Sequence, residues 1–215
     1  MKRLFSVILV LVSLLIFSQE KPKFWDDIQH FKQLDKDNPP PENAILFLGS
    51  SSFTKWTDVS DYFPGKTIIN RGFGGSTLFD LNLYSEELLK PYHPKQIIIY
   101  CGENDIADNV KPKVALNRFK NFYKEIRRYY PEIQVDYISA KYSPSREKYW
   151  AQMKQMNNMI RKYLSRQKNA EYIDITNAME GKDGKVRTDI FLEDMLHMKP
   201  EGYELWTKVM MPYMK

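Results

Sequence analysis

The chain has 215 residues, 32 basic and 27 acidic side chains, a formal net charge of +5 and a single cysteine, Cys101. This length fits one domain with a substantial core. One cysteine excludes an internal disulfide, so we expect Cys101 to be a small buried hydrophobic residue. The basic residues are scattered among acidic ones without a block of like charge, which argues against nucleic acid as a partner.

The first 19 residues have the pattern of an export signal. Lys2 and Arg3 precede an apolar stretch over residues 4–17, and polar residues follow it. A membrane-spanning helix needs about 20 apolar residues, so a signal peptide over residues 1–19 is the preferred interpretation and an uncleaved N-terminal anchor is the alternative. Cleavage would lower the net charge from +5 to +3. We expect an exported protein, periplasmic or extracellular, with no stable membrane span after cleavage.

Residues 20–43 are expected to precede the main domain. Residues 24–37 mix apolar and charged side chains and predict a helix. Pro39, Pro40 and Pro41 end this helix and form a stiff lead-in to the first strand.

From residue 44 onward, short apolar runs alternate with longer amphipathic stretches. Residues 97–99 are continuously apolar, as expected for a strand covered on both faces. The alternation predicts an α/β domain over residues 44–215, with a parallel sheet and helices on both sides. The predicted strands are residues 44–48, 67–70, 96–101, 133–139 and 171–175, and the predicted helices are residues 78–89, 112–130, 146–167 and 200–213.

Distinctive turns follow the first three predicted strands. Three consecutive serines, Ser50, Ser51 and Ser52, come after the first strand. A glycine-rich turn at residues 72–76 follows the second strand, and residues 103–105 follow the third. In a parallel sheet, ligands bind beyond the carboxyl ends of the strands, so these turns are expected to share one site.

Two side chains near the C-terminus can supply an acid and a base. Asp194 and His197 are three residues apart, so the carboxylate can hold one imidazole nitrogen and leave the other free. With a serine from the first turn they form a nucleophile, a base and an orienting group. The glycine-rich turn offers an uncrowded backbone N–H, and Asn104 an amide N–H₂, to a developing oxyanion. Each feature alone also fits an ordinary turn or cap, but together they favour a serine hydrolase.

Cofactor and metal chemistry fit the sequence less well. Residue 77 is threonine where a dinucleotide fingerprint needs its third glycine, and no P-loop lysine follows. Glu103 and Asp105 would suit a metal, but the three histidines have no ligand-like spacing. We therefore expect no cofactor and no metal.

The ordered set of turns resembles the four sequence blocks of the SGNH/GDSL hydrolases, a superfamily of esterases and lipases. Residues 47–52 resemble the first block, 70–75 the second, 102–105 the third and 194–197 the last. The resemblance covers residues 44–213 and implies a flavodoxin-like, three-layer α/β/α sandwich with a parallel sheet of about five strands.

The resemblance also implies a role for each site residue. Ser51 would be the nucleophile, His197 the general base and acid, and Asp194 the residue that orients His197. The backbone N–H groups of Ser51 and Gly75 and the side chain of Asn104 would form the oxyanion hole.

Two residues of the first block depart from the family pattern. Ser50 stands where the family usually has an aspartate, and Ser52 stands where it usually has an apolar residue. The first difference removes a carboxylate beside the nucleophile, so the choice of Ser51 over its neighbours depends on the register of the block.

These observations predict a serine esterase for a short acyl group. An O-acetyl ester on a carbohydrate is the preferred substrate class, because the domain is small, carries an export signal and has no evident lid. Phe73, Phe79 and Trp56 could stack on sugar rings, although a place in the core is the simpler interpretation. A lysophospholipase or an enzyme like platelet-activating-factor acetylhydrolase is the alternative within the enzyme class. A non-catalytic carbohydrate- or envelope-binding protein is the alternative outside it, and the oligomeric state stays open.

Overall fold

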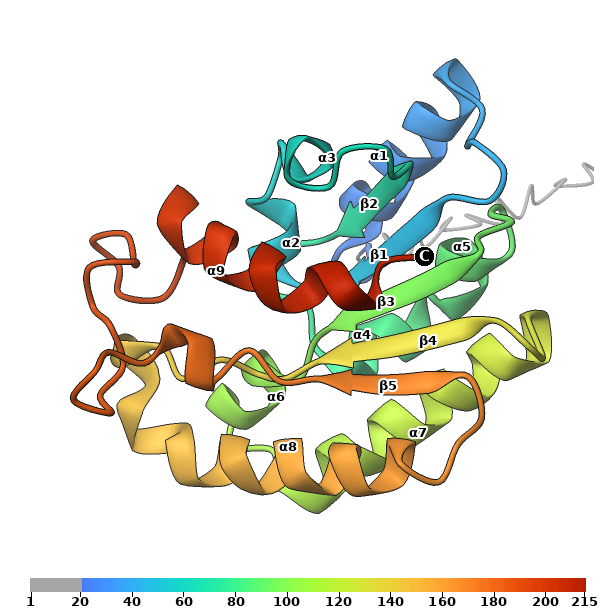
Figure 1. Ribbon diagram of the computed structural model, residues 1–215. Helices are drawn as coiled ribbons and strands as arrows, with labels where there is room; N and C mark the ends of the chain where they lie inside the picture. The colour runs from blue at the N-terminus through green and yellow to red at the C-terminus, as the bar shows by residue number, and fades with distance from the viewer. Residues whose placement is uncertain (1–20) are drawn as a thin grey trace, which may run out of the picture.

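The computed structural model describes residues 21–215, and the predicted signal peptide lies outside this range (Figure 1). Within residues 21–215, no helix is both long enough and apolar enough to span a membrane. The segment before the sheet forms helix α1 (Trp25–Asp37), in the range where the sequence predicts a helix.

A parallel five-stranded sheet forms the centre of the molecule (Figure 1). Its strand order is β2-β1-β3-β4-β5, with all neighbouring pairs parallel. Each observed strand lies within two residues of its predicted bounds, so the expected sheet is confirmed. The strands are β1 (Ile45–Gly49), β2 (Ile68–Gly72), β3 (Gln96–Tyr100), β4 (Gln134–Ile138) and β5 (Ala170–Ile173).

Two hydrophobic cores lie on the two faces of this sheet. Side chains alternate along a strand, so Leu46 and Leu48 of β1 enter one core while Ile45 and Phe47 enter the other. Helices cover both faces, which confirms the predicted three-layer α/β/α sandwich (Figure 1). One layer contains α1, α4 (Leu78–Leu83), α5 (Ser85–Leu89), α7 (Pro112–Tyr129) and α8 (Trp150–Leu164), and the other contains α2 (Ser51–Thr54), α3 (Val59–Tyr62) and α9 (Pro200–Met210).

Two of the predicted helices are interrupted. The helix expected over residues 78–89 divides into α4 and α5 at Tyr84, whose backbone leaves helical geometry with φ −103° and ψ 21°. The Tyr84 hydroxyl there donates to the backbone oxygen of Lys23, which ties this break to the start of α1. The helix expected over residues 146–167 begins with a separate 3₁₀ turn, η1 (Pro144–Tyr149), within which Arg146 leaves helical geometry at φ −114° and ψ 21°.

Short helices replace two of the expected turns. Only Ser50 separates β1 from helix α2, and two residues separate β3 from α6 (Glu103–Ala107). Gly49 is aligned with Gly72 of β2 and with Tyr100 of β3, so these three strands end at one edge of the sheet. The candidate site lies along this edge.

Candidate active site

Ser51 is the first residue of α2 and follows the sharp exit of the chain from β1. This exit requires glycine at position 49, because a Cβ there would lie 2.0 Å from the backbone oxygen of Tyr100. Gly72, at the end of β2, is equally restricted, since a Cβ there would lie 2.6 Å from Cβ of Phe53 in α2. The close approach of the end of β1 to β3, and of α2 to β2, thus determines where the Ser51 hydroxyl lies.

The structure brings Ser51, His197 and Asp194 into one hydrogen-bonded chain. His197 Nε2 lies 2.9 Å from Ser51 Oγ, although the two residues are 146 positions apart. His197 Nδ1 lies 2.5 Å from Asp194 Oδ2. This geometry suits the tautomer in which Nδ1–H donates to the carboxylate and Nε2 accepts the serine proton.

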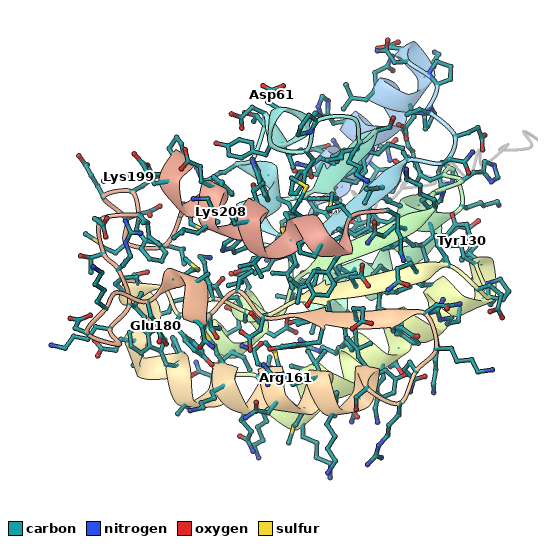
Figure 2. All side chains as sticks on the ribbon, in the orientation of Figure 1. Asp61, Tyr130, Arg161, Glu180, Lys199 and Lys208 are labelled. Atoms are coloured by element: carbon teal, nitrogen blue, oxygen red, sulfur yellow. The ribbon has the colours of Figure 1, made fainter. Side chains whose placement is uncertain are left out.

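The loop between Glu180 and Lys199, both labelled in Figure 2, carries Asp194 and His197. Met195 takes a left-handed conformation at φ 51°, and the resulting tight turn directs two backbone N–H groups at Asp194 Oδ1. These groups belong to Leu196 and His197, and each lies 2.9 Å from the oxygen.

The same turn controls the ionisation of Asp194. Partial desolvation would raise the pKa of its carboxyl, but the hydrogen bonds from the backbone and ring of His197 and from the Leu196 N–H lower the pKa to about 2. Asp194 is therefore ionised at neutral pH and can hold the His197 ring in one orientation. The imidazole is shielded, with only 14% of its side chain exposed, whereas 47% of the Asp194 side chain is exposed.

Two of the three groups that the family resemblance implies for the oxyanion hole converge on the hydroxyl oxygen of Ser50. The Ser51 N–H donates to Ser50 Oγ at 2.6 Å, and Asn104 Nδ2 donates to the same atom at 3.0 Å. Ser50 is buried, so this oxygen marks a protected point beside Ser51 at which two N–H donors meet.

The third group belongs to the glycine-rich turn after β2. Gly75 has φ +83°, and a Cβ built there would meet no atom within 4 Å, so the space beside its Cα is open. Within residues 21–215, the Gly75 N–H donates to no backbone or side-chain acceptor. At the neighbouring Gly74, a Cβ would lie 3.9 Å from Cβ of Ser51, which shows that the turn passes beside the candidate nucleophile.

The side chain of Asn104 is held at both ends of its amide. Its Nδ2 group donates to the backbone oxygen of Ser76 at 2.9 Å as well as to Ser50 Oγ. At the other end, Arg146 Nη2 donates to Asn104 Oδ1 at 2.7 Å. Because only the oxygen can accept from a guanidinium, Arg146 determines which end of the amide faces Ser50.

Beneath Asn104 lies a buried group of charged and polar side chains centred on Glu103. Lys141 Nζ lies 2.8 Å from Glu103 Oε2, and Arg146 Nη1 lies 3.3 Å from Glu103 Oε1. The hydroxyls of Tyr100 and Ser143 donate to the same carboxylate at 2.5 and 3.1 Å. Burial alone would raise the pKa of Glu103, but the two cations and the hydrogen bonds hold it below its usual value.

Sequence reasoning did not assign a role to Lys141, Ser143 or Arg146. They follow β4, whose following turn carries none of the four blocks of the family resemblance, and Arg146 lies at the start of the helix that the sequence predicts over residues 146–167. Their position in the sequence could have indicated them, because they follow the carboxyl end of a parallel strand, as Ser51 and Asn104 do. The concentration of polar residues over 141–146 is visible in the sequence.

Other residues considered for the site have structural roles. Asp105 is fully buried and accepts from the Leu78 N–H and from Arg118, both at 2.8 Å, which ties α6 to α4 and α7. Phe73 and Trp56 are fully buried in the two cores, so they offer no face for a sugar, whereas Phe79 is 54% exposed. Across residues 21–215, no group of three or more histidine, cysteine, aspartate or glutamate residues is placed to hold a metal ion.

The three-layer fold, with serine, histidine and aspartate joined at the strand ends, has the architecture of a serine hydrolase. The model of the GDSL-like lipase/acylhydrolase family matches residues 47–205. The chain therefore belongs to this family and is a hydrolase of ester bonds.

Solved structures show the same fold. A Streptococcus pneumonia protein named as a candidate platelet activating factor is 23% identical, with a TM-score of 0.77 over 88% of this chain and 92% of that chain. A GDSL-like lipase from Bacteroides thetaiotaomicron is 17% identical, with a TM-score of 0.72 over 87% of this chain and 96% of that chain. A family 3 carbohydrate esterase from Clostridium thermocellum is 12% identical, with a TM-score of 0.62 over 80% of this chain and 98% of that chain. A comparison with curated proteins finds no match.

Proposed function

We propose that the chain is a serine esterase with Ser51 as nucleophile, His197 as general base and acid, and Asp194 as the residue that orients His197. The observation that carries this proposal is the continuous contact from Ser51 Oγ through the His197 ring to Asp194. A nucleophile, a base and an orienting carboxylate in hydrogen-bond contact are the set that acyl transfer needs.

In the proposed reaction, Ser51 Oγ attacks the ester carbonyl carbon while His197 Nε2 takes its proton. The carbonyl oxygen becomes an oxyanion beside the N–H groups of Ser51 and Gly75 and the Asn104 amide. His197 then protonates the leaving alcohol, and an acyl group stays on Ser51. Water attacks this acyl-enzyme with His197 again as base, which releases the acid and restores Ser51.

Ser50 has a defined place in this scheme. Its hydroxyl oxygen accepts from two of the proposed oxyanion donors in the resting site. An ester oxygen that arrives beside Ser51 would take over these hydrogen bonds or share them. A serine at this position therefore serves as an acceptor that keeps the Ser51 N–H and the Asn104 amide aligned before substrate binds.

For the substrate, we propose a short acyl group, preferably acetyl, on a carbohydrate. The likeness in fold to the Clostridium thermocellum carbohydrate esterase supports this choice. The likeness to the Streptococcus pneumonia protein supports a lipid ester as the second candidate. Release of acetate from acetylated xylan, compared with release of fatty acid from lysophospholipid, distinguishes the two.

We also propose that the protein is exported and that the basic and apolar pattern of residues 1–19 directs this. The intact mass of the protein recovered from a producing cell tests this directly. A mass that lacks this segment supports signal cleavage, and the full-length mass supports an N-terminal anchor.

Hydrolysis of p-nitrophenyl acetate by the wild type and by a folded Ser51→Ala variant tests the catalytic proposal. Activity in the wild type that is lost in the variant supports both the chemistry and the nucleophile. Equal activity in both proteins contradicts the assignment of Ser51. A folded wild type without activity on this or any other tested ester would favour a binding protein on the same fold.

A further inference from the structure

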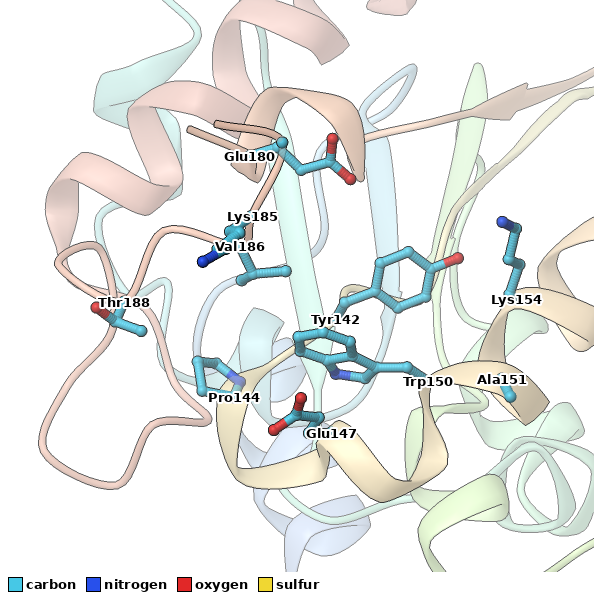
Figure 3. A pocket seen from close by; sticks show the side chains of 11 residues that line it. Tyr142, Pro144, Glu147, Trp150, Ala151, Lys154, Glu180, Lys185, Val186 and Thr188 are labelled. Atoms are coloured by element: carbon cyan, nitrogen blue, oxygen red, sulfur yellow. The ribbon is translucent and has the colours of Figure 1, made fainter. Parts of the chain in front are cut away.

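A cavity separate from the Ser51 site lies at the same end of the sheet (Figure 3). It is enclosed by η1, the start of α8 and the hairpin over residues 180–188. Its volume is about 610 Å³, within the range of sites that hold small ligands. Tyr142, just before η1, lines it together with residues from all three segments, among them Glu147, Trp150, Lys154, Glu180 and Lys185.

Two aromatic rings belong to the apolar lining of this cavity, together with Pro144, Ala151 and Val186. The rings of Tyr142 and Trp150 lie next to each other with centroids 5.9 Å apart and planes inclined by 45° (Figure 3). The indole N–H of Trp150 already donates to the backbone oxygen of Ser143 at 2.9 Å, so Trp150 offers a ligand in the cavity only its ring surface. Adjacent, half-buried rings of this kind suit the C–H faces of a sugar.

Four charged side chains surround these rings: Glu147, Lys154, Glu180 and Lys185. The set holds two carboxylates and two ammonium groups, and none of the four forms an ion pair with any residue of the range 21–215. Sugar hydroxyls can donate to the carboxylates and accept from the lysines.

The turn η1 joins the cavity to the candidate active site. Pro144 and Glu147 of this turn line the cavity. Between them, the N–H and Oγ of Ser145 both donate at 3.0 Å to the backbone oxygen of Met195, which lies between Asp194 and His197 in the chain. Arg146, the next residue, reaches inward to Asn104. One turn therefore contacts the cavity, the histidine loop and the oxyanion residues.

We propose that this cavity is a carbohydrate-binding subsite, which holds sugar units of the substrate beyond the unit whose ester reacts at Ser51. The inference rests on the proposed esterase function and adds to it a substrate of more than one sugar unit. The hairpin that forms one wall, closed by the pairing of Glu180 with Val186, leads directly into the loop that carries Asp194 and His197.

Kinetics on two substrates test the subsite. Glu147→Ala, Lys185→Ala and Tyr142→Ala should each raise KM for an acetylated xylo-oligosaccharide by about tenfold, because each loses one hydrogen bond or ring contact. Their kcat/KM for p-nitrophenyl acetate, which has no sugar unit to occupy the cavity, should stay unchanged. Lys148→Ala and Lys182→Ala are matched controls, because both lysines are exposed, lie in the same segments and do not line the cavity. Equal losses on both substrates, or no change on either, would overturn the proposal.

A binding measurement separates this inference from the esterase proposal. Calorimetric titration of the Ser51→Ala variant with xylotetraose, chitotetraose and cellotetraose should show binding of at least one, which Glu147→Ala and Lys185→Ala in that background weaken. Such binding would support the subsite even if the wild type hydrolysed no ester, in which case the proposed function alone would fail. If none of these oligosaccharides binds, or if phosphocholine binds in their place, the carbohydrate assignment is wrong.

Discussion

Arg146 donates through Nη2 to Oδ1 of Asn104 at 2.7 Å, across 42 positions of the chain. The amide of Asn104 is thereby fixed with its nitrogen directed at Ser50 and Ser76. In an oxyanion hole, a flipped amide would present an oxygen to a negative charge, so the orientation of this group matters as much as its presence.

Replacement of Arg146 should therefore lower kcat more than it changes KM. We expect Arg146→Gln to reduce kcat for p-nitrophenyl acetate by about 10–100-fold, less than complete loss of one oxyanion donor. Arg146→Lys should recover part of the activity, because the lysine ammonium group can still donate one hydrogen bond to Asn104 Oδ1. In an Asn104→Ala background, the replacement of Arg146 should cost little more. A full additive loss in the double variant would mean that Arg146 acts elsewhere than through Asn104.

Loss of the Asn104 amide should impair catalysis while the fold stays intact. We expect Asn104→Ala to lower kcat by about 10²–10³, the usual effect of one oxyanion donor. Circular dichroism and thermal unfolding should show a folded protein. If the variant does not fold, Asn104 is a structural residue of α6 and its proposed role is wrong.

The pKa of Asp194 makes a prediction about the pH profile. Because its pKa is lowered to about 2, the carboxyl is ionised throughout the pH range in which the protein would be assayed. A change in kcat/KM between pH 7 and pH 4 should therefore not report titration of Asp194. We expect Asp194→Asn to lower kcat by about 10⁴, because the amide no longer favours the productive tautomer of the ring. A loss below tenfold would show that the backbone of the loop alone orients His197.

Removal of the buried charge on Glu103 should destabilise the fold. Glu103→Gln leaves Lys141 and Arg146 without their carboxylate, and the loss of one partner from a buried pair costs about 3–5 kcal/mol. Replacement of both members, as in Glu103→Gln with Lys141→Met, should recover part of the lost stability. Chemical denaturation of the three proteins measures the difference.

The same carboxyl gives stability a defined dependence on pH. The pKa of Glu103 in the folded protein is lowered, so its contribution is fully present above the unfolded pKa of about 4.3. It is lost as the pH falls through the lower pKa of the folded state. The Tm of the wild type should therefore fall more steeply below pH 4 than the Tm of Glu103→Gln. Parallel curves would show that Glu103 does not titrate in this range.

Local sequence patterns were sufficient to predict most of the fold. Apolar runs such as residues 96–101 must be covered on both faces, and their alternation with amphipathic stretches allows few arrangements other than a parallel sheet between helices. The breaks at Tyr84 and Arg146 were not predictable in this way, because each depends on contacts of its residue with distant parts of the chain: Lys23 for the first, Glu103 and Asn104 for the second.

The site shows the same division between local and distant information. The sequence predicted Ser51, Asp194, His197, Gly75 and Asn104 as site residues, because each belongs to a short block that resembles a block of the family. Only the tertiary structure revealed that Arg146 orients Asn104 and that Lys141 forms an ion pair with Glu103. It also revealed that Ser50 Oγ accepts hydrogen bonds from two N–H donors. These contacts join residues that no local pattern relates. They form because parallel strands distant in the chain end side by side, where a buried polar group must find its partner across the sheet edge.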